Sequence, residues 1–353
     1  MYLGILVCLI LGVLATWLGG LQRFVGAPMI GLFLGIIVSN FLPGRFIQSS
    51  KSGAAFSSKY LLKLGIILAG GTLSFNAIIG AGLSALPLII FNICLSFAGA
   101  LFLGRLLGVS PKTGVLVGGG TAICGGTAIA TLHPVVKSDE EEMAYAMTAI
   151  FLFDILAAIM WPYAARALSL TPEQYGMLGG LAISDTSSVT AAGETFNALM
   201  GSAAETLING EVMTAGAIAI VVKLTRTVML VFVVIAVMLA TMIKGKKSGE
   251  TPANDGSFLK RAVKSFPLFV LGFLAMALIN TFANFGTVDL GFITLGKLLS
   301  KGYKYFITVA LVGVGYKIKL GDLFKKGAKP IVLGGFTWAL IAASTLTYVL
   351  VFM

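Results

Sequence analysis

Two polar stretches that interrupt apolar sequence carry the residues most suited to chemistry. The first, GGGTAICGGTAIAT at residues 118–131, has five glycines, three threonines and one cysteine. Glycine destabilises a helix interior by about 1 kcal/mol relative to alanine, and broken backbone inside a bilayer survives only beside protein or a water-filled cavity. Discontinuous helices of secondary transporters direct free N–H groups toward anions. We therefore predict a discontinuous helix that binds substrate, with close helix packing of small residues as the alternative; its predicted ligands are Gly120, Thr121, Cys124, Gly125, Gly126 and Thr127.

The second stretch, SDTSSVTAAG at residues 184–193, contains a carboxylate among hydroxyl groups. An ionisable residue within a membrane segment indicates a functional site. Asp185, Thr186 and Ser187 offer the hard oxygen ligands that Na⁺ prefers, and Asp185 alone is suited to exchange a proton. The alternative is an Asp that caps a helix at the tip of a re-entrant segment. The substrate ligands predicted here are Ser184, Thr186, Ser187 and Ser188, and no other metal site is expected.

Three further charged residues lie in apolar surroundings. Asp154 stands alone in AIFLFDILAAIMWP, and Lys223 and Arg226 are three residues apart, on one face of a helix. An acid and a base that are both short of water are more stable when paired. The planar guanidinium of Arg226 suits an oxyanion, so we predict it as a substrate ligand and assign Asp154 and Lys223 to ion coupling with Asp185. The alternative is a Lys–Arg pair that snorkels to the membrane surface.

The elements that must position these residues are membrane helices. The chain of 353 residues is 58% hydrophobic and 11% charged, far below the roughly 25% charged residues of soluble proteins. Apolar runs long enough to span a bilayer recur along it, which predicts an all-α polytopic membrane protein with about 10–11 transmembrane helices. The runs are 2–20, 26–43, 60–80, 85–107, 112–136, 143–168, 173–193, 212–243, 262–283, 302–316 and 330–352.

Basic residues follow every even-numbered run, including Arg105, Lys112 and Arg166, whereas SDEEE at 138–142 falls in the opposite set of loops. By the positive-inside rule, the N-terminus is cytoplasmic, the C-terminus is outside, and the chain is a multi-pass protein of the cell membrane. The net charge of +11 therefore belongs to short loops facing lipid head groups, and no nucleic-acid partner is expected.

We expect one transmembrane domain, with approximate halves 1–168 and 173–353 and a polar linker at 244–257. Residues 60–87 align without gaps on 303–330, and the two segments would run in opposite directions. That relation predicts an inverted repeat.

The motifs exclude several kinds of enzyme. The chain has neither a phosphate-binding G-x-x-x-x-G-K-[ST] loop nor H-E-x-x-H. We expect no enzymatic activity and no cofactor beyond Na⁺ or H⁺ as a coupling ion. The interpretation is a secondary active transporter of a small anion; the alternatives are the membrane subunit of an ion-pumping decarboxylase complex and an anion channel.

The chain resembles the YeiH-type family of candidate sulfate exporters, also called UPF0324 membrane proteins. The likeness rests on GTAICGGTAIA, HPVVK with EEEMAYA, AISDTSSVTAAG and VKLTR, in this order, with GAPMIGLFLGIIVSN near the start and GYKIKLGDLFKKGAKP near the end. It implies the superfamily of cation/proton antiporters and anion transporters, in which broken helices cross in a core domain beside a scaffold domain that forms homodimers. The family's G-T-S-I-C-G-A motif falls on 120–126 and its D-T-S-S-V or D-T-A-Q-V motif on 185–189. The residues that depart from the common pattern are Ala122, Asp154, Ser184 and Ser188.

Overall fold

The computed structural model describes residues 1–21, 26–247, 268–289, 293–318 and 328–353. Each of the eleven predicted apolar runs overlaps at least one helix in these residues, and five helical spans among them are long and apolar enough to cross a membrane. The predicted fold class, an all-α polytopic membrane protein, is confirmed. The helices of the first part of the chain are α1 (Tyr2–Leu21), α2 (Ala27–Phe41), α3 (Gly44–Phe56), the π-helix η1 (Ser57–Leu61), α4 (Leu62–Gly70) and α5 (Phe75–Leu106).

The chain continues with α6 (Pro111–Ala122), α7 (Gly126–Val136), α8 (Glu140–Ala167), α9 (Pro172–Ala182), α10 (Thr186–Met200) and the short 3-10 helix η2 (Gly201–Ala204). The antiparallel strands β1 (Glu205–Ile208) and β2 (Glu211–Thr214) follow. The last helices are α11 (Ala215–Val228), α12 (Leu230–Lys247), α14 (Leu268–Ala283), α15 (Leu295–Gly315) and α17 (Ala328–Phe352). Side-chain caps start several of them, because hydroxyl and carboxylate oxygens accept the unpaired first N–H groups: Ser74, Ser110, Asp139, Thr171 and Thr214.

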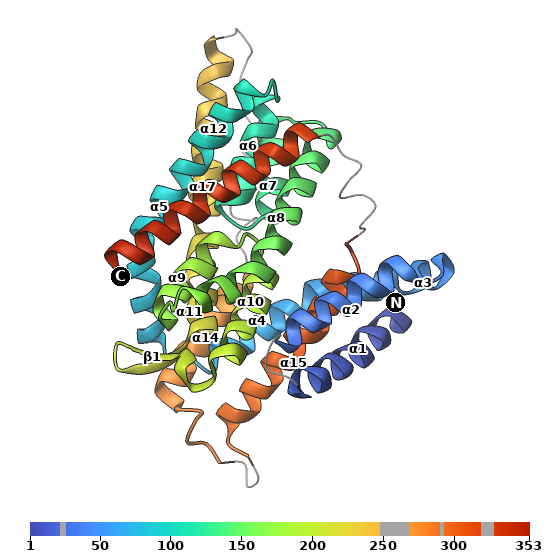
Figure 1. Ribbon diagram of the computed structural model, residues 1–353, viewed down its shortest axis with the longest axis vertical. Helices are drawn as coiled ribbons and strands as arrows, with labels where there is room; N and C mark the ends of the chain where they lie inside the picture. The colour runs from blue at the N-terminus through green and yellow to red at the C-terminus, as the bar shows by residue number, and fades with distance from the viewer. Residues whose placement is uncertain (22–25, 248–267, 290–292, 319–327) are drawn as a thin grey trace.

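The helices form two layers. One layer, which we call the panel, consists of α1–α4, α14 and α15; in Figure 1 the blue helices α1–α3 and the orange α15 lie at the lower right. The other, which we call the core, consists of α5–α12 and α17, with the red α17 crossing α5. The layers draw on both ends of the chain, because α14 and α15 pack with the N-terminal helices. Residues 248–257 of the predicted linker lie outside the described residues, and the division into two halves remains a prediction.

The first polar stretch is discontinuous, as predicted, and its two halves fold back on each other. The Lys112 ammonium, at the start of α6, donates to the Lys137 carbonyl, directly after α7, at 2.7 Å. A Cβ added to Gly119 on α6 would lie 2.3 Å from the Leu132 side chain on α7. Residues 111–136 are therefore a helical hairpin, hairpin 1, with its tip at 123–125.

The second polar stretch is also a hairpin. The rings of Tyr175 on α9 and Phe196 on α10 stack with centroids 3.9 Å apart. Gly176 and Gly193, on the same two helices, both pack against residues 215–216 at the start of α11. Residues 172–200 therefore form hairpin 2, with its tip at 183–185. Both arms return to the end of the core that holds the β strands.

This folding back corrects the predicted alternation of the loops, because the hairpins at 111–136 and 172–200 each enter and leave the core at one end. The segment 138–142 therefore lies at the same end as Lys112, where Glu140 contacts His133 at 3.8 Å, and Arg166 lies at the other end because α8 separates them. Since a hairpin adds no net crossing, the predicted sides of the termini are unchanged, and they remain predictions.

The sequence prediction lacks helix α3 and the strands β1 and β2. Helix α3 falls in what was read as a basic loop; it packs against α1, where Gly4 and Gly53 let the backbones touch, since a Cβ on Gly4 would lie 2.8 Å from Gly53 Cα. The strands β1 and β2 are joined at Asn209–Gly210, both with positive φ, the pair typical of a tight hairpin turn. The inverted repeat remains a prediction: α4 and α15 do pack together, but 319–327 lie outside the described residues.

Candidate functional site

The two hairpin tips meet halfway along the core helices. Asp154 is near the middle of α8, and its Oδ1 accepts hydrogen bonds from the backbone N–H groups of Ser184 and Asp185, both at 2.7 Å. Trp338, near the middle of α17, donates from Nε1 to the Ala182 carbonyl at 3.0 Å. A Cβ on Gly125, in the tip of hairpin 1, would lie 3.9 Å from the Ser184 carbonyl in the tip of hairpin 2. The hairpins thus enter from opposite ends and touch in the interior.

Lys223, on α11, joins the two tips. Its side chain is fully buried, and Nζ donates to the carbonyls of Ile123 at 2.6 Å, of Ile183 at 3.2 Å and of Ser184. A buried ammonium is tolerated where its donors are satisfied. These three carbonyls, left without helical partners where the backbone breaks, use all its donors.

Arg226, one turn further along α11, joins the helix ends just before the tips. Its guanidinium is 1% exposed and donates to the carbonyls of Thr121 and Ala122 on α6 and of Gly180 and Leu181 on α9. Each helix C-terminus carries roughly half a negative charge, so the two cations face two negative helix ends. The snorkelling alternative does not fit, because both side chains lie inside the core.

The two carboxylates complete the charge balance without direct ion pairs. Among the described residues, the ion pairs within 4.0 Å are His133–Glu140 and Lys304–Glu194. Asp154 binds the N–H side of the tip of hairpin 2 while Lys223 binds its carbonyl side, so the predicted acid–base pairing acts through the peptide groups between them. The formal charges of +2 from Lys223 and Arg226 and −2 from Asp154 and Asp185 cancel, which reduces the penalty of burying them.

Asp185 caps helix α10. Its Oδ2 accepts from the Ser187 N–H at 2.9 Å and from the Ser187 hydroxyl, which is the geometry of the capping alternative. The residue is half-buried, and within the described residues no protein donor is bonded to Oδ1. Capping therefore leaves one carboxylate oxygen able to bind a cation or a proton.

The start of α7 lacks such a cap. Gly125 has a φ of +62°, a backbone conformation that glycine adopts more readily than other residues. No side chain caps the helix. In the described part of the chain, no acceptor is bonded to the N–H groups of Gly126 and Thr127. Gly126 is half-buried and Thr127 is exposed. This helix start, with its positive dipole end, is chemically suited to an oxyanion.

The remaining predicted residues lie around the tips in different roles. Gly120 packs against Ile129 within hairpin 1; Thr121 donates to the Val117 carbonyl at 2.9 Å and lies 3.3 Å from the Thr337 hydroxyl. Cys124, Ser184, Thr186, Ser187 and Ser188 are all at most 9% exposed. The sequence reasoning missed Thr337 and Trp338, which hold hairpins 1 and 2 against α17 with ordinary hydrogen bonds. The signal available in the sequence for these two residues was a polar group inside an apolar run.

Comparison with known proteins identifies the family. Residues 3–334 match a family model described as conserved hypothetical protein 698. The chain is 34% identical over 343 residues to a UPF0324 membrane protein of Streptococcus pyogenes, covering 97% of this chain and 95% of the relative. It is 32% identical over 348 residues to one of Fusobacterium nucleatum, covering 96% and 94%. The resemblance read from the motifs is confirmed: this multi-pass membrane protein belongs to the UPF0324 membrane protein family.

Proposed function

We propose that the protein is a secondary active transporter that moves a small anion, such as sulfate or a sulfonate, by alternating access. The observation that carries this proposal is the meeting of two hairpins, inserted from opposite ends, around buried Lys223 and Arg226. Interrupted backbone next to ionisable groups is how transporters form binding sites at mid-membrane. Because each hairpin closes the site toward a different end, small movements expose it to one end at a time.

The anion is proposed to bind at the uncapped start of α7. The N–H groups of Gly126 and Thr127 and the Thr127 hydroxyl supply donors, and the helix dipole supplies favourable potential. Arg226 is not proposed to contact the anion directly, because its guanidinium donates to four backbone carbonyls. It and Lys223 contribute positive potential and hold the tips in place.

Coupling is proposed to act through Asp185 in hairpin 2. Either Na⁺ binds to Asp185 with Thr186 and Ser187, or a proton binds to Asp185 alone. A cation there would offset the charge of an anion at the start of α7, so each ligand would favour binding of the other. A homodimer held by the panel, with its N-termini in the cytoplasm, completes the proposed assembly.

The test is anion flux into proteoliposomes. Labelled sulfate or a labelled sulfonate is offered with a Na⁺ gradient, a proton gradient or neither, and the variants are Asp185→Asn and Glu211→Gln, an exposed control on β2. We expect Asp185→Asn to remove gradient-driven flux while the protein remains folded, and the control to match wild type. Full gradient-driven flux in Asp185→Asn would remove Asp185 from the mechanism. Thermal stabilisation by the same anions, with and without Na⁺, reports binding independently.

A further inference from the structure

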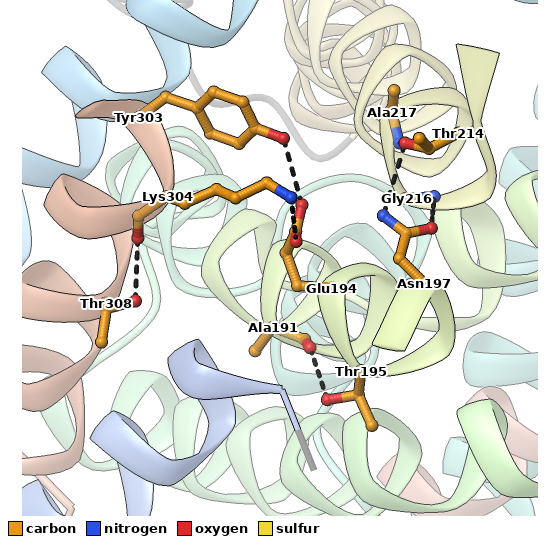
Figure 2. Close-up of polar contacts among 10 residues, drawn as sticks. All are labelled: Ala191, Glu194, Thr195, Asn197, Thr214, Gly216, Ala217, Tyr303, Lys304 and Thr308. Carbon is orange, nitrogen blue, oxygen red and sulfur yellow. Dashed lines mark hydrogen bonds and ion pairs between the residues drawn. The ribbon is translucent and has the colours of Figure 1, made fainter. Parts of the chain in front are cut away.

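A charged contact joins hairpin 2 to the panel away from the tips. Glu194 lies on α10, the second arm of the hairpin, and its side chain is 11% exposed. Figure 2 shows the Lys304 ammonium and the Tyr303 hydroxyl, both from α15, directed at this carboxylate, each at 3.2 Å. Lys304 and Tyr303 are adjacent in the sequence, so one turn of α15 binds both oxygens of the Glu194 carboxylate.

Glu194 moves with the core because its arm is fixed to α11. The Asn197 amide donates to the Thr214 hydroxyl at 3.3 Å and accepts from the Gly216 N–H at 3.1 Å (Figure 2). Gly193 and Gly216 bring the two backbones into contact, since a Cβ on Gly193 would lie 2.7 Å from Gly216 Cα. Lys223 and Arg226, on the same helix, bind both tips. The hairpins and α11 thus form one body, and Glu194 is on the side of it that faces the panel.

A second polar contact between this body and the panel lies beside the ion pair. Next to Glu194, the Thr195 hydroxyl accepts from the Gly26 N–H, just before α2, at 3.1 Å. Thr195 is 1% exposed, so this contact excludes water, whereas the Lys304 side chain is 48% exposed. Ion pairs in contact with water are weak and reversible, with a median strength of 1 kcal/mol or less, or about fivefold in an equilibrium. Such a contact holds two bodies together without fixing them permanently.

We propose that Glu194, Tyr303 and Lys304 form a latch between core and panel, closed in the state described, which opens when the core moves. This inference rests on the proposed transport function, because alternating access requires the body with the hairpins to move relative to its support. The latch sets the population of the closed state. It does not touch the transported ion.

The latch is tested by the reactivity of a thiol placed beneath it. In protein whose native cysteines are replaced by alanine, Thr195→Cys places a probe that is buried while the latch is closed. Proteoliposomes are treated with a small methanethiosulfonate reagent, without added anion. We expect Glu194→Gln and Lys304→Met each to raise the labelling rate about 2- to 5-fold, because each removes the ion pair.

The two variants separate latch opening from a local charge effect. Removing a nearby negative charge speeds thiol labelling by itself, and removing a positive charge slows it. A rise in both variants therefore supports the latch, whereas opposite changes, or no change in either, would overturn it. The charge exchange Glu194→Lys with Lys304→Glu is expected to bring the rate back toward the parent value. Glu205→Gln, an exposed control on β1, is expected to leave it unchanged.

Different results refute the latch and the proposed transport function. Labelling needs no substrate, while anion flux is measured in parallel, without the reagent, on vesicles that hold the protein and the same latch variants with Thr195 and the native cysteines retained. A raised labelling rate, combined with no anion flux in the protein with native cysteines, upholds the latch and counts against the proposed function. Anion flux combined with unchanged labelling rates overturns the latch alone. Thermal stability of every variant identifies any change that comes from misfolding.

Discussion

Replacing Lys223 by methionine tests whether this side chain holds the two tips together. Methionine keeps most of the apolar stem but leaves three buried carbonyls without their donor: Ile123, Ile183 and Ser184. Removing one partner of a buried charged contact destabilises by about 3–5 kcal/mol. Because the substitution also removes the penalty of burying an ammonium, we take the lower value, about 3 kcal/mol, which is about 150-fold in an equilibrium.

The natural probe of this change is Cys124, which lies in the tip of hairpin 1 and is 4% exposed. With Cys8 and Cys94 replaced by alanine, the rate of Cys124 alkylation reports how often the tip opens. We expect Lys223→Met to raise that rate by up to about 150-fold. Loss of a nearby positive charge alone would slow the thiol reaction, so an increase identifies opening of the tip.

The matched control is Lys301→Met, the same chemical change at an exposed position on α15. Its effect on stability is expected to stay within about 0.5 kcal/mol, with Cys124 alkylated at the parent rate. Equal rates in Lys223→Met and Lys301→Met would refute the assignment of Lys223 as the residue that joins the tips.

Three more substitutions test the site and its support. Asp154→Asn exchanges a charged acceptor of two tip N–H groups for a neutral one, so we expect a loss of about 1–2 kcal/mol in detergent melting and slower anion flux; unchanged melting and flux would argue against this role. Gly193→Val forces α10 away from α11 and is expected to destabilise by about 1–3 kcal/mol, whereas Gly302→Ala, with nothing within 4 Å of the added Cβ, is expected to be neutral or slightly stabilising. Gly125→Ala requires positive φ of a residue with a Cβ, so we expect about 1–3 kcal/mol lower stability and weaker binding of sulfate or sulfonate; wild-type behaviour would show that the tip adapts.

The sequence contained the site's composition but not its geometry. Glycine, threonine and serine inside apolar runs identified both discontinuities, and the three-residue spacing of Lys223 and Arg226 placed both on one face, as observed. Whether a broken helix continues or folds back depends on contacts such as Lys112 with Lys137 and Tyr175 with Phe196. Those pairs are 25 and 21 positions apart, and hydrophobic periodicity carries no information on them.

The missed elements have local explanations. Helix α3 is amphipathic and contains few apolar residues, so a search for membrane spans passes over it. The turn at Asn209–Gly210 was a readable signal for a β-hairpin, hidden between two long apolar runs. Capping of α10 by Asp185 was weighed as the alternative to ion binding; the geometry accommodates both, because a carboxylate has two oxygens.

The position of Lys223 and Arg226 in the chain has a consequence for biogenesis. Both hairpins are synthesised before α11, yet the cations that satisfy their broken ends arrive only with that helix. While the ribosome is still translating the first 214 residues, the carbonyls of 121–123, 180, 181, 183 and 184 have no such partners. Nascent chains stopped before residue 215 are therefore expected to keep both hairpins accessible to proteases or associated with the insertion machinery, and chains extended past 228 to release them as a folded unit.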